Sequence, residues 1–168
     1  TLAEAGMGEA FRPDFARLLT TVAGSGATTL ILVPELLRGL IAAQAALRLD
    51  HQLEMIAVGG ARVSPALLEA AAAVGLPVVE GYGLSECASV VALNLPGDAC
   101  PGTVGRPLPH LQIALAADGE ILVSPHPFLG YVGGEAAPRV LHTGDTGAFD
   151  AQGRLSISGR KANTLITA

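Results

Sequence analysis

The chain has little of several residue types, and each shortage excludes a class of protein. Only two of its 168 residues are cysteines, Cys87 and Cys100, without a C-x-x-C spacing. We therefore expect two small buried thiols rather than a disulfide framework or a structural zinc site, and a reducing, cytoplasmic location. Aromatic residues make up 4% of the chain, there is no basic tract, and the net charge is −5. A nucleic-acid partner is therefore not expected.

Long hydrophobic runs are also missing, although half of the residues are apolar and only 15% are charged. Pro, Gly, Arg or Gln interrupts the apolar runs well before the roughly 18 residues that would span a bilayer, so no transmembrane segment is predicted. The composition is typical of a globular chain of one domain or two subdomains. The apolar excess predicts some surface that contacts absent protein or lets the chain self-associate.

Helix and strand patterns alternate through the first half of the chain. The continuously apolar run 28–33 is typical of a strand covered on both faces. Pro34 and Pro65 suit the first positions of helices, and Ser64 suits an N-cap. This half predicts an α/β fold with parallel strands. Its helices and strands are expected, in order, at about 13–22, 28–33, 34–47, 53–58, 65–74 and 77–80.

The pattern changes after Asn94, where Pro and Gly residues punctuate a connector without helical periodicity. Asp118-Gly119 signals a hairpin. The second half therefore predicts a small antiparallel β subdomain, and the domains are expected at 1–95 (α/β), 96–160 (antiparallel β) and 161–168 (the start of a hinge). Its strands are expected at 111–115, 120–124, 139–142, 147–149 and 154–158.

The stretch Val78 to Glu86 is the strongest candidate site. Gly81 and Gly83 free the backbone around Tyr82, so that its ring could lie across a flat ligand. Ser85 and Glu86 could hold a phosphate oxygen and its magnesium ion, because hard cations take oxygen ligands. Ligands of parallel α/β sheets bind beyond the carboxyl ends of the strands, where this stretch and the loop Gly59-Gly60-Ala61 are both expected.

Three common motifs match this chain only in part. The run Gly81 to Glu86 opens like a dinucleotide fingerprint but has Glu86 in place of its last glycine. The run Gly83 to Cys87 opens like a hydrolase nucleophile elbow but has Cys87 in place of the final glycine. Gly24 to Thr29 resembles a phosphate loop in composition, but no lysine follows. Serine hydrolase and dinucleotide-binding functions are therefore disfavoured.

Two further motifs are ambiguous when each is considered alone. Asp145, in Thr143-Gly144-Asp145, could be a turn residue that satisfies its own backbone or a ligand-binding carboxylate. Arg160 could bind a ribose or phosphate, or belong with Lys161 to a basic surface pair. The four histidines are scattered and favour surface or loop positions.

The order of the motifs decides between these alternatives. Gly-Gly-Ala, Gly-Tyr-Gly-x-Ser-Glu, Gly-Glu-Ile-Leu-Val, Thr-Gly-Asp and Asp-x-x-Gly-x-Leu-x-Ile-x-Gly-Arg follow one another between Thr28 and Ala168. This series resembles the adenylate-forming superfamily of acyl-CoA synthetases, aryl-CoA ligases and nonribosomal adenylation domains. The fold it implies is a middle piece of the acyl-CoA synthetase-like N-terminal domain.

The resemblance implies a role for each candidate residue. Tyr82 would stack on adenine between Gly81 and Gly83, and the loop Gly59-Gly60-Ala61 would line the acyl pocket and approach the adenine. By the same resemblance, Ser85 would contact the α-phosphate and Glu86 would hold magnesium. Asp145 and Arg160 would bind the ribose.

The implied reaction uses ATP to activate a carboxylic acid as an acyl-adenylate, with coenzyme A as the usual thiol acceptor. The ending Gly-Arg-Lys-Ala-Asn-Thr-Leu-Ile-Thr-Ala resembles long-chain acyl-CoA synthetases, which favours a fatty acid. Two positions depart from the family pattern: His142 replaces a common Arg, and Ala162 replaces a common Asp or Lys at the hinge. The open alternatives are a nonribosomal adenylation domain, a non-catalytic nucleotide-binding module of the same fold and a structural scaffold.

The family's lysine-bearing phosphate loop and its small C-terminal domain, with a second lysine, have no counterpart in this sequence. We therefore predict that the purified chain has no ligase activity, because the groups that would hold pyrophosphate are missing. Carboxylate-dependent pyrophosphate exchange measures this activity, and exchange above a no-acid control would contradict the prediction.

Overall fold

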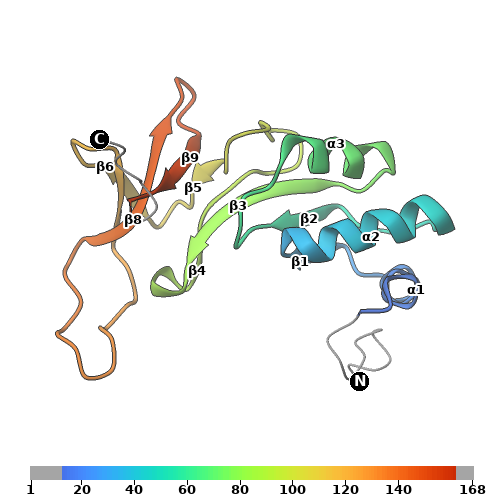
Figure 1. Cartoon of the computed structure of the whole chain (residues 1–168), viewed down its shortest axis with the longest axis horizontal. Helices are drawn as coiled ribbons and strands as arrows, with labels where there is room; N and C mark the ends of the chain where they lie inside the picture. Colours follow the sequence, from blue (N-terminus) through green and yellow to red (C-terminus); the bar gives the residue numbers. More distant parts are fainter. Residues whose placement is uncertain (1–12, 162–168) are drawn as a thin grey trace, which may run out of the picture. The chain divides into compact units, whose positions relative to one another are not determined.

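The computed structural model describes residues 13–161, which form two compact units (Figure 1). The first unit ends at Val79 and the second begins at Glu80, so the division falls inside strand β3 (Val78–Leu84). The sequence pattern changes later, at about residue 95. The division comes earlier because the end of β3 pairs antiparallel with β4 (Ser89–Leu93), which belongs to the second unit.

The first unit alternates helices and strands, as the sequence predicts. Strands β1 and β2 are parallel, with Thr29 opposite Met55 and Leu32 opposite Val58. The backbone N–H of Ile56 donates to the carbonyl of Pro77, at the approach to β3 (2.8 Å). The elements of this unit before β3 are α1 (Phe15–Ser25), β1 (Thr29–Leu32), α2 (Pro34–Leu47), β2 (Met55–Val58) and α3 (Pro65–Ala73).

The helix ends follow from local chemistry. The Ser64 hydroxyl accepts a hydrogen bond from the backbone N–H of Leu67 (3.3 Å), so Ser64 is the predicted N-cap of α3. Pro34 is the first residue of α2, also as predicted. Helix α1 runs three residues beyond the predicted end at Val22 and stops at Gly26, whose φ of +70° suits glycine at a C-cap.

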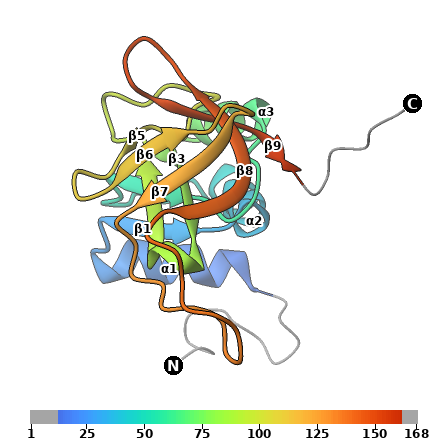
Figure 2. The same ribbon diagram turned by 90° about the vertical axis from the view of Figure 1, so that its left-hand side faces the viewer.

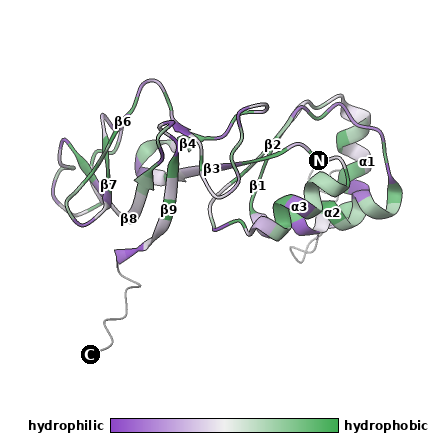
Figure 3. Cartoon of the chain, turned by 90° about the horizontal axis from the view of Figure 1, so that it is seen from above, coloured by the Kyte–Doolittle hydropathy of each residue, from purple (hydrophilic) through white to green (hydrophobic). Residues whose placement is uncertain are grey.

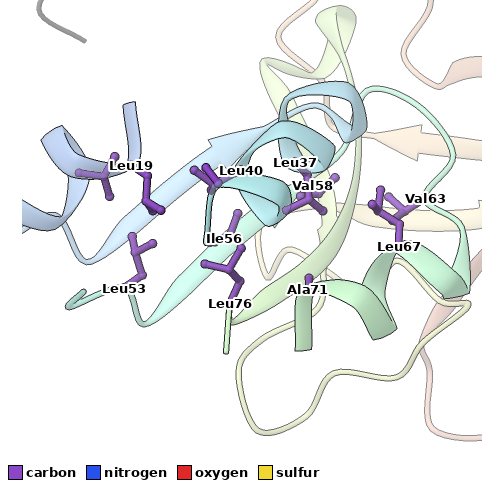
Figure 4. Close-up of a cluster of buried hydrophobic side chains, with 12 residues drawn as sticks. Leu19, Leu37, Leu40, Leu53, Ile56, Val58, Val63, Leu67, Ala71 and Leu76 are labelled. Carbon is purple, nitrogen blue, oxygen red and sulfur yellow. The ribbon is translucent and has the colours of Figure 1, made fainter. Parts of the chain in front are cut away.

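The core of the first unit lies between its helices and β2. Figure 4 shows side chains of α1, α2, β2 and α3 pointing toward one another. Strand β1 differs from the expectation of burial on both faces, because Ile31 is 81% exposed within the described part of the chain. Fully buried large side chains of this core are Leu19, Leu37, Leu40, Ile56 and Val58.

The second unit is antiparallel, as predicted, and Figure 2 shows its larger sheet face on, with strand order β6-β7-β8-β9. The two strands expected at 139–142 and 147–149 are one long strand, β8. Strand β4 lies just before the expected connector and β5 lies within it, and neither strand was predicted from the sequence. The elements after β4 are β5 (Arg106–Pro107), β6 (Gln112–Leu115), β7 (Glu120–Ser124), β8 (Leu141–Phe149) and β9 (Leu155–Arg160).

The second unit has a separate apolar core, and buried polar groups fix its connector. The Asn94 amide donates to the carbonyl of Thr103 (2.6 Å) and accepts from the backbone N–H of Cys100 (3.1 Å). Both cysteines are free, and Cys87 is buried as expected, whereas Cys100 is only partly buried, so the expectation of two buried thiols was wrong for Cys100. No helix in the described residues is long and apolar enough to cross a membrane. The buried apolar members of this core are Cys87, Val91, Ala92, Leu111, Ile121, Val123, Leu141 and Leu155.

Gly83 is needed for strand packing. The pairing of β3 with β4 changes register between Tyr82 and Gly83, and a Cβ on Gly83 would lie 1.5 Å from the carbonyl oxygen of Ser89. A Cβ on Gly81 would be less crowded. Its nearest neighbour would be Leu93 Cδ1, the flexible end of a side chain, at 2.9 Å. From the sequence, both glycines were interpreted as backbone freedom beside a ligand, whereas in the structure the close approach of β4 accounts for Gly83.

We predict that Gly83→Ala lowers the free energy of unfolding by about 1–3 kcal/mol or more, because β4 must shift to admit the methyl group. Denaturant unfolding of the purified chain measures this change. Gly159→Ala in β9 is the matched control, since the nearest atom to its added Cβ is Thr146 Oγ1 at 3.9 Å. Equal stability of the two variants would contradict the role given to Gly83.

Candidate functional site

A hydrogen bond between Tyr82 and Asp145 joins two of the predicted site residues within the second unit. The Tyr82 hydroxyl in β3 donates to Asp145 Oδ2 in β8 (2.7 Å). Burial is the main cause that raises the pKa of Tyr82, and the bond to the Asp145 carboxylate adds to it, so the phenol stays a donor. The carboxylate of Asp145 thus contacts a residue 63 positions away and is more than a turn residue.

Strand β8 presents Asp145 at a defined position. The backbone N–H of Asp145 donates to the Thr143 hydroxyl (3.1 Å), and that hydroxyl donates to the carbonyl of Ile121 in β7 (2.8 Å). Gly144 between them has a φ of +73°, a conformation that favours glycine. The motif Thr-Gly-Asp therefore forms a bent part of β8 that leaves Asp145 only 8% exposed.

Arg160 lies opposite Asp145 in the pairing of β8 with β9. Its Nε is 3.5 Å from Asp145 Oδ1, an ion pair in which the arginine side chain is 59% exposed and that of the aspartate 12%. The two oxygens of Asp145 therefore have different partners, a phenol on Oδ2 and a guanidinium on Oδ1. Arg160 is a partner of the site, not a member of an isolated surface pair.

Glu86 is held by a tyrosine that the sequence analysis did not select. The Tyr131 hydroxyl donates to Glu86 Oε1 (2.6 Å). This hydrogen bond is the main cause that lowers the pKa of the Glu86 carboxyl, and the positive charge of Arg160 contributes in the same direction. Three of the predicted residues, Tyr82, Asp145 and Arg160, are thus in direct contact, and the charge of Arg160 also acts on Glu86.

Tyr131 reaches Glu86 from the loop 125–140, which has internal structure. Its ring packs edge-on against Phe128, with the centroids 4.8 Å apart. Its carbonyl accepts from the backbone N–H of Gly134 (2.9 Å), while Gly130 pairs with Ala136. The sequence gives one signal for Tyr131: the chain has only two tyrosines, and each is preceded by glycine. In the structure, each tyrosine donates to a predicted carboxylate.

The other predicted residues have simpler surroundings. Ser85 is exposed and begins the short 3-10 helix Ser85–Cys87 that carries Glu86. The loop Gly59-Gly60-Ala61 follows β2 in the first unit, where the backbone N–H of Gly59 donates to the carbonyl of Leu32 (3.2 Å). The contribution of Ser85 and of this loop to a site stays a prediction. Ala162 lies outside the described residues.

His142 and Lys161 converge on a second carboxylate. Glu120 Oε2 is 3.1 Å from His142 Nδ1 and 3.1 Å from Lys161 Nζ. Lys161 also donates to Asp118 (2.6 Å). The residue that departs from the family pattern, His142, therefore binds Glu120 rather than Asp145.

The described residues contain no group of three or more His, Cys, Asp or Glu side chains that could hold a metal ion. Glu86 therefore belongs to no such group within the described residues. This arrangement fits magnesium of the kind that is held by one or two carboxylates and by the phosphates of a bound nucleotide. It does not fit a cation enclosed by protein ligands alone.

Comparison with curated proteins finds ligases. The chain is 40% identical over 117 residues to the long-chain-fatty-acid–CoA ligase FadD15 of Mycobacterium bovis, covering 66% of this chain and 20% of that protein. It is 37% identical over 133 residues to the long-chain-fatty-acid–CoA ligase 6 of Rattus norvegicus, covering 67% and 19%. The chain thus spans about a fifth of the length of these relatives.

Solved structures share the fold. The anthranilate CoA ligase AuaEII in complex with anthranoyl-AMP matches with a TM-score of 0.79 at 23% identity, covering 90% of this chain and 33% of that one. VinN in complex with L-aspartate matches with a TM-score of 0.75 at 29% identity, covering 86% and 41%. The family model described as AMP-binding enzyme matches residues 4–132. This chain belongs to the AMP-binding enzyme family.

Proposed function

We propose that this chain forms the adenosine-binding and acyl-binding part of an AMP-forming acid–thiol ligase. Such an enzyme activates a carboxylic acid with ATP and transfers the acyl group to coenzyme A. The observation that carries the proposal is the contact of Tyr82, Asp145 and Arg160, three motif residues from separate strands. The names of the relatives, both long-chain-fatty-acid–CoA ligases, favour a fatty acid as substrate over the amino acid of a nonribosomal adenylation domain.

The Asp145 carboxylate suits a ribose. A carboxylate has about four lone-pair positions, so it can accept from both ribose hydroxyls while it keeps the hydrogen bond from Tyr82. Arg160 pairs with Asp145 and offers further hydrogen-bond donors at the exposed side of the pair. Because its hydroxyl is anchored, the Tyr82 ring has a fixed orientation in which its face can stack on adenine.

Ser85 and Glu86 suit the phosphate end of the nucleotide. Glu86 would hold magnesium, which neutralises charge on the phosphate oxygens when it is bound. The Tyr131 hydroxyl is the main cause that lowers the pKa of Glu86, so the Glu86 carboxylate is ionised near neutral pH and can bind magnesium. The Ser85 hydroxyl, one residue earlier, would donate to the α-phosphate.

The proposed reaction needs no protein nucleophile. An oxygen of the substrate carboxylate attacks the α-phosphorus of ATP, the bond to the β-phosphate oxygen breaks, and pyrophosphate leaves. The coenzyme A thiolate then attacks the acyl carbonyl and AMP leaves with the bonding electrons. The residues of this chain orient the nucleotide in both steps, and Gly59-Gly60-Ala61 would line the pocket for the acyl group. A cytoplasmic location belongs to the same proposal.

Asp145→Asn tests the ribose role. We expect AMP to bind this variant on the order of 10-fold to 100-fold more weakly than the parent chain, because hydrogen bonds to a charged acceptor contribute about 1.5–3 kcal/mol. Isothermal titration of AMP with magnesium measures the difference. The loss should shrink for 2′,3′-dideoxy-AMP, which lacks the hydroxyls that Asp145 would bind.

The matched control for that experiment is Asp98→Asn, since Asp98 is an exposed aspartate that pairs only with Arg106 in the described contacts. Its AMP affinity should equal that of the parent. If Asp145→Asn binds AMP as tightly as Asp98→Asn does, the ribose site is assigned wrongly.

Tyr131→Phe tests the link between Tyr131 and the magnesium ligand. The variant keeps the ring against Phe128 but removes the donor to Glu86, so we expect the pKa of Glu86 to rise toward its ordinary value of 4.5. The sign follows from linkage: the hydrogen bond stabilises the parent above pH 4.5, and this contribution is lost as pH falls through the lowered pKa. A carboxyl-carbon NMR titration measures it, with Tyr82→Phe as control. An unchanged Glu86 titration in Tyr131→Phe would contradict the assignment.

A further inference from the structure

Glu120 is a buried carboxylate whose partners lie next to the proposed ribose-binding residues. It is the first residue of β7, and its side chain is 8% exposed. Its Oε1 accepts from the backbone N–H of Gly144 (2.9 Å), and its Oε2 meets His142 Nδ1 and Lys161 Nζ, each at 3.1 Å. The proposed reaction gives Glu120 no role.

The partners of Glu120 are placed in a way that suggests a role. Gly144 directly precedes Asp145, and Lys161 directly follows Arg160. Asp145 and Arg160 are themselves opposite each other in the pairing of β8 with β9. One carboxylate therefore binds the backbone beside one member of the ion pair and the side chain beside the other.

The contacts are of the strong kind. Hydrogen bonds that involve a charged group are shorter and roughly twice as strong as neutral ones. The pKa of Glu120 is lowered by His142 first, and then by the Gly144 N–H and Lys161, so the carboxylate is ionised at neutral pH. Figure 3 shows the hydrophilic end of β9, where Arg160 lies and Lys161 follows.

The hairpin turn before Glu120 reinforces this arrangement. The backbone N–H of Glu120 donates to Asp118 Oδ1 (3.1 Å), and the backbone N–H of Gly147 donates to the carbonyl of Gly119 (3.0 Å). The turn between β6 and β7 is thereby hydrogen-bonded to β8 at Gly147, two residues after Asp145. Glu120 thus has a fixed backbone from which its side chain can hold Gly144 in its left-handed conformation.

We propose that Glu120 is a positioning residue that sets the geometry of the Asp145 and Arg160 pair for the nucleotide ribose. The inference rests on the proposed function, because it gives Glu120 an effect on ribose binding through Asp145. Glu120 does not contact the nucleotide itself in this proposal. It acts through the Gly144 backbone on one strand and through Lys161 on the other.

A purely structural role makes a different prediction. If Glu120 only stabilises the sheet, its loss lowers the free energy of unfolding but leaves the preference for ribose hydroxyls unchanged. If Glu120 positions Asp145, its loss weakens AMP more than 2′,3′-dideoxy-AMP. The ratio of the two affinities is therefore the informative quantity.

The experiment compares the parent chain with Glu120→Ala and Glu120→Gln. The alanine variant removes every contact, whereas the glutamine variant keeps an oxygen for the Gly144 N–H and removes the charge. We expect Glu120→Ala to weaken AMP binding about tenfold, with less than a twofold effect on 2′,3′-dideoxy-AMP, and Glu120→Gln to fall between it and the parent. Asp98→Asn is the control, because Asp98 is an exposed carboxylate that pairs with Arg106 and contacts neither Gly144, Glu120 nor Lys161 in the described side-chain interactions. Its affinity ratio should stay at the parent value.

A second measurement needs no nucleotide. Hydrogen exchange of the Gly144 and Asp145 amides should be at least roughly tenfold faster in Glu120→Ala, while the Val123 amide in β7 keeps its protection. If the alanine variant does not fold, the glutamine variant decides by the same two readouts. An affinity ratio and an exchange rate that both equal the parent values would overturn the proposal.

These readouts also separate the inference from the proposed function. If the parent binds AMP no better than 2′,3′-dideoxy-AMP, the ribose role of Asp145 fails, and exchange at Gly144 still decides whether Glu120 holds this part of β8. If the parent discriminates and only the Asp145 variant loses that discrimination, the ribose site stands and the role of Glu120 is overturned.

Discussion

The hydrogen bond from the Tyr82 hydroxyl to Asp145 is the contact on which the site depends. It connects the strand that begins the second unit with the longest strand of the larger sheet, across 63 positions of sequence. The half-buried phenol of Tyr82 needs an acceptor and the buried carboxylate of Asp145 needs donors, so each group satisfies the other. The ion pair of Asp145 with Arg160 then adds a third strand, and Arg160 in turn acts on Glu86.

Much of the fold was predictable because its signals are local. Pro34, Ser64 and Pro65 specify helix starts through their own backbone chemistry, and they occupy those positions in the structure. Strands β4 and β5 were not predictable in the same way. Strand β4 precedes the Pro-rich and Gly-rich connector and pairs with β5 inside it, and the buried Asn94 amide binds Thr103 within the same connection. No periodicity in the connector reveals these long-range contacts.

In the candidate site, too, residues in local motifs were predictable and residues that act through long-range contacts were not. The order of the motifs selected Tyr82, Glu86, Asp145 and Arg160. The structure joins Tyr82, Asp145 and Arg160 by direct contacts, while Glu86 contacts Tyr131. Tyr131 was missed because its loop has no helix or strand pattern, and its role comes only from a long-range contact with Glu86. Glu120 was present in a motif, but its function as a partner of Gly144 is visible only when β7 and β8 are paired.

The separate cores of the two units have a consequence for how the protein can change. Tyr82, Asp145 and Arg160, which contact one another, and Glu86 belong to the unit with the core around Ile121, Val123 and Leu155. Gly59-Gly60-Ala61 follow a strand of the other core. A substitution that repacks the first core need not disturb the ion pair or either tyrosine. Under the proposed function, a substitution in the first unit can therefore change the pocket for the acyl chain without altering the nucleotide-binding contacts of the second unit.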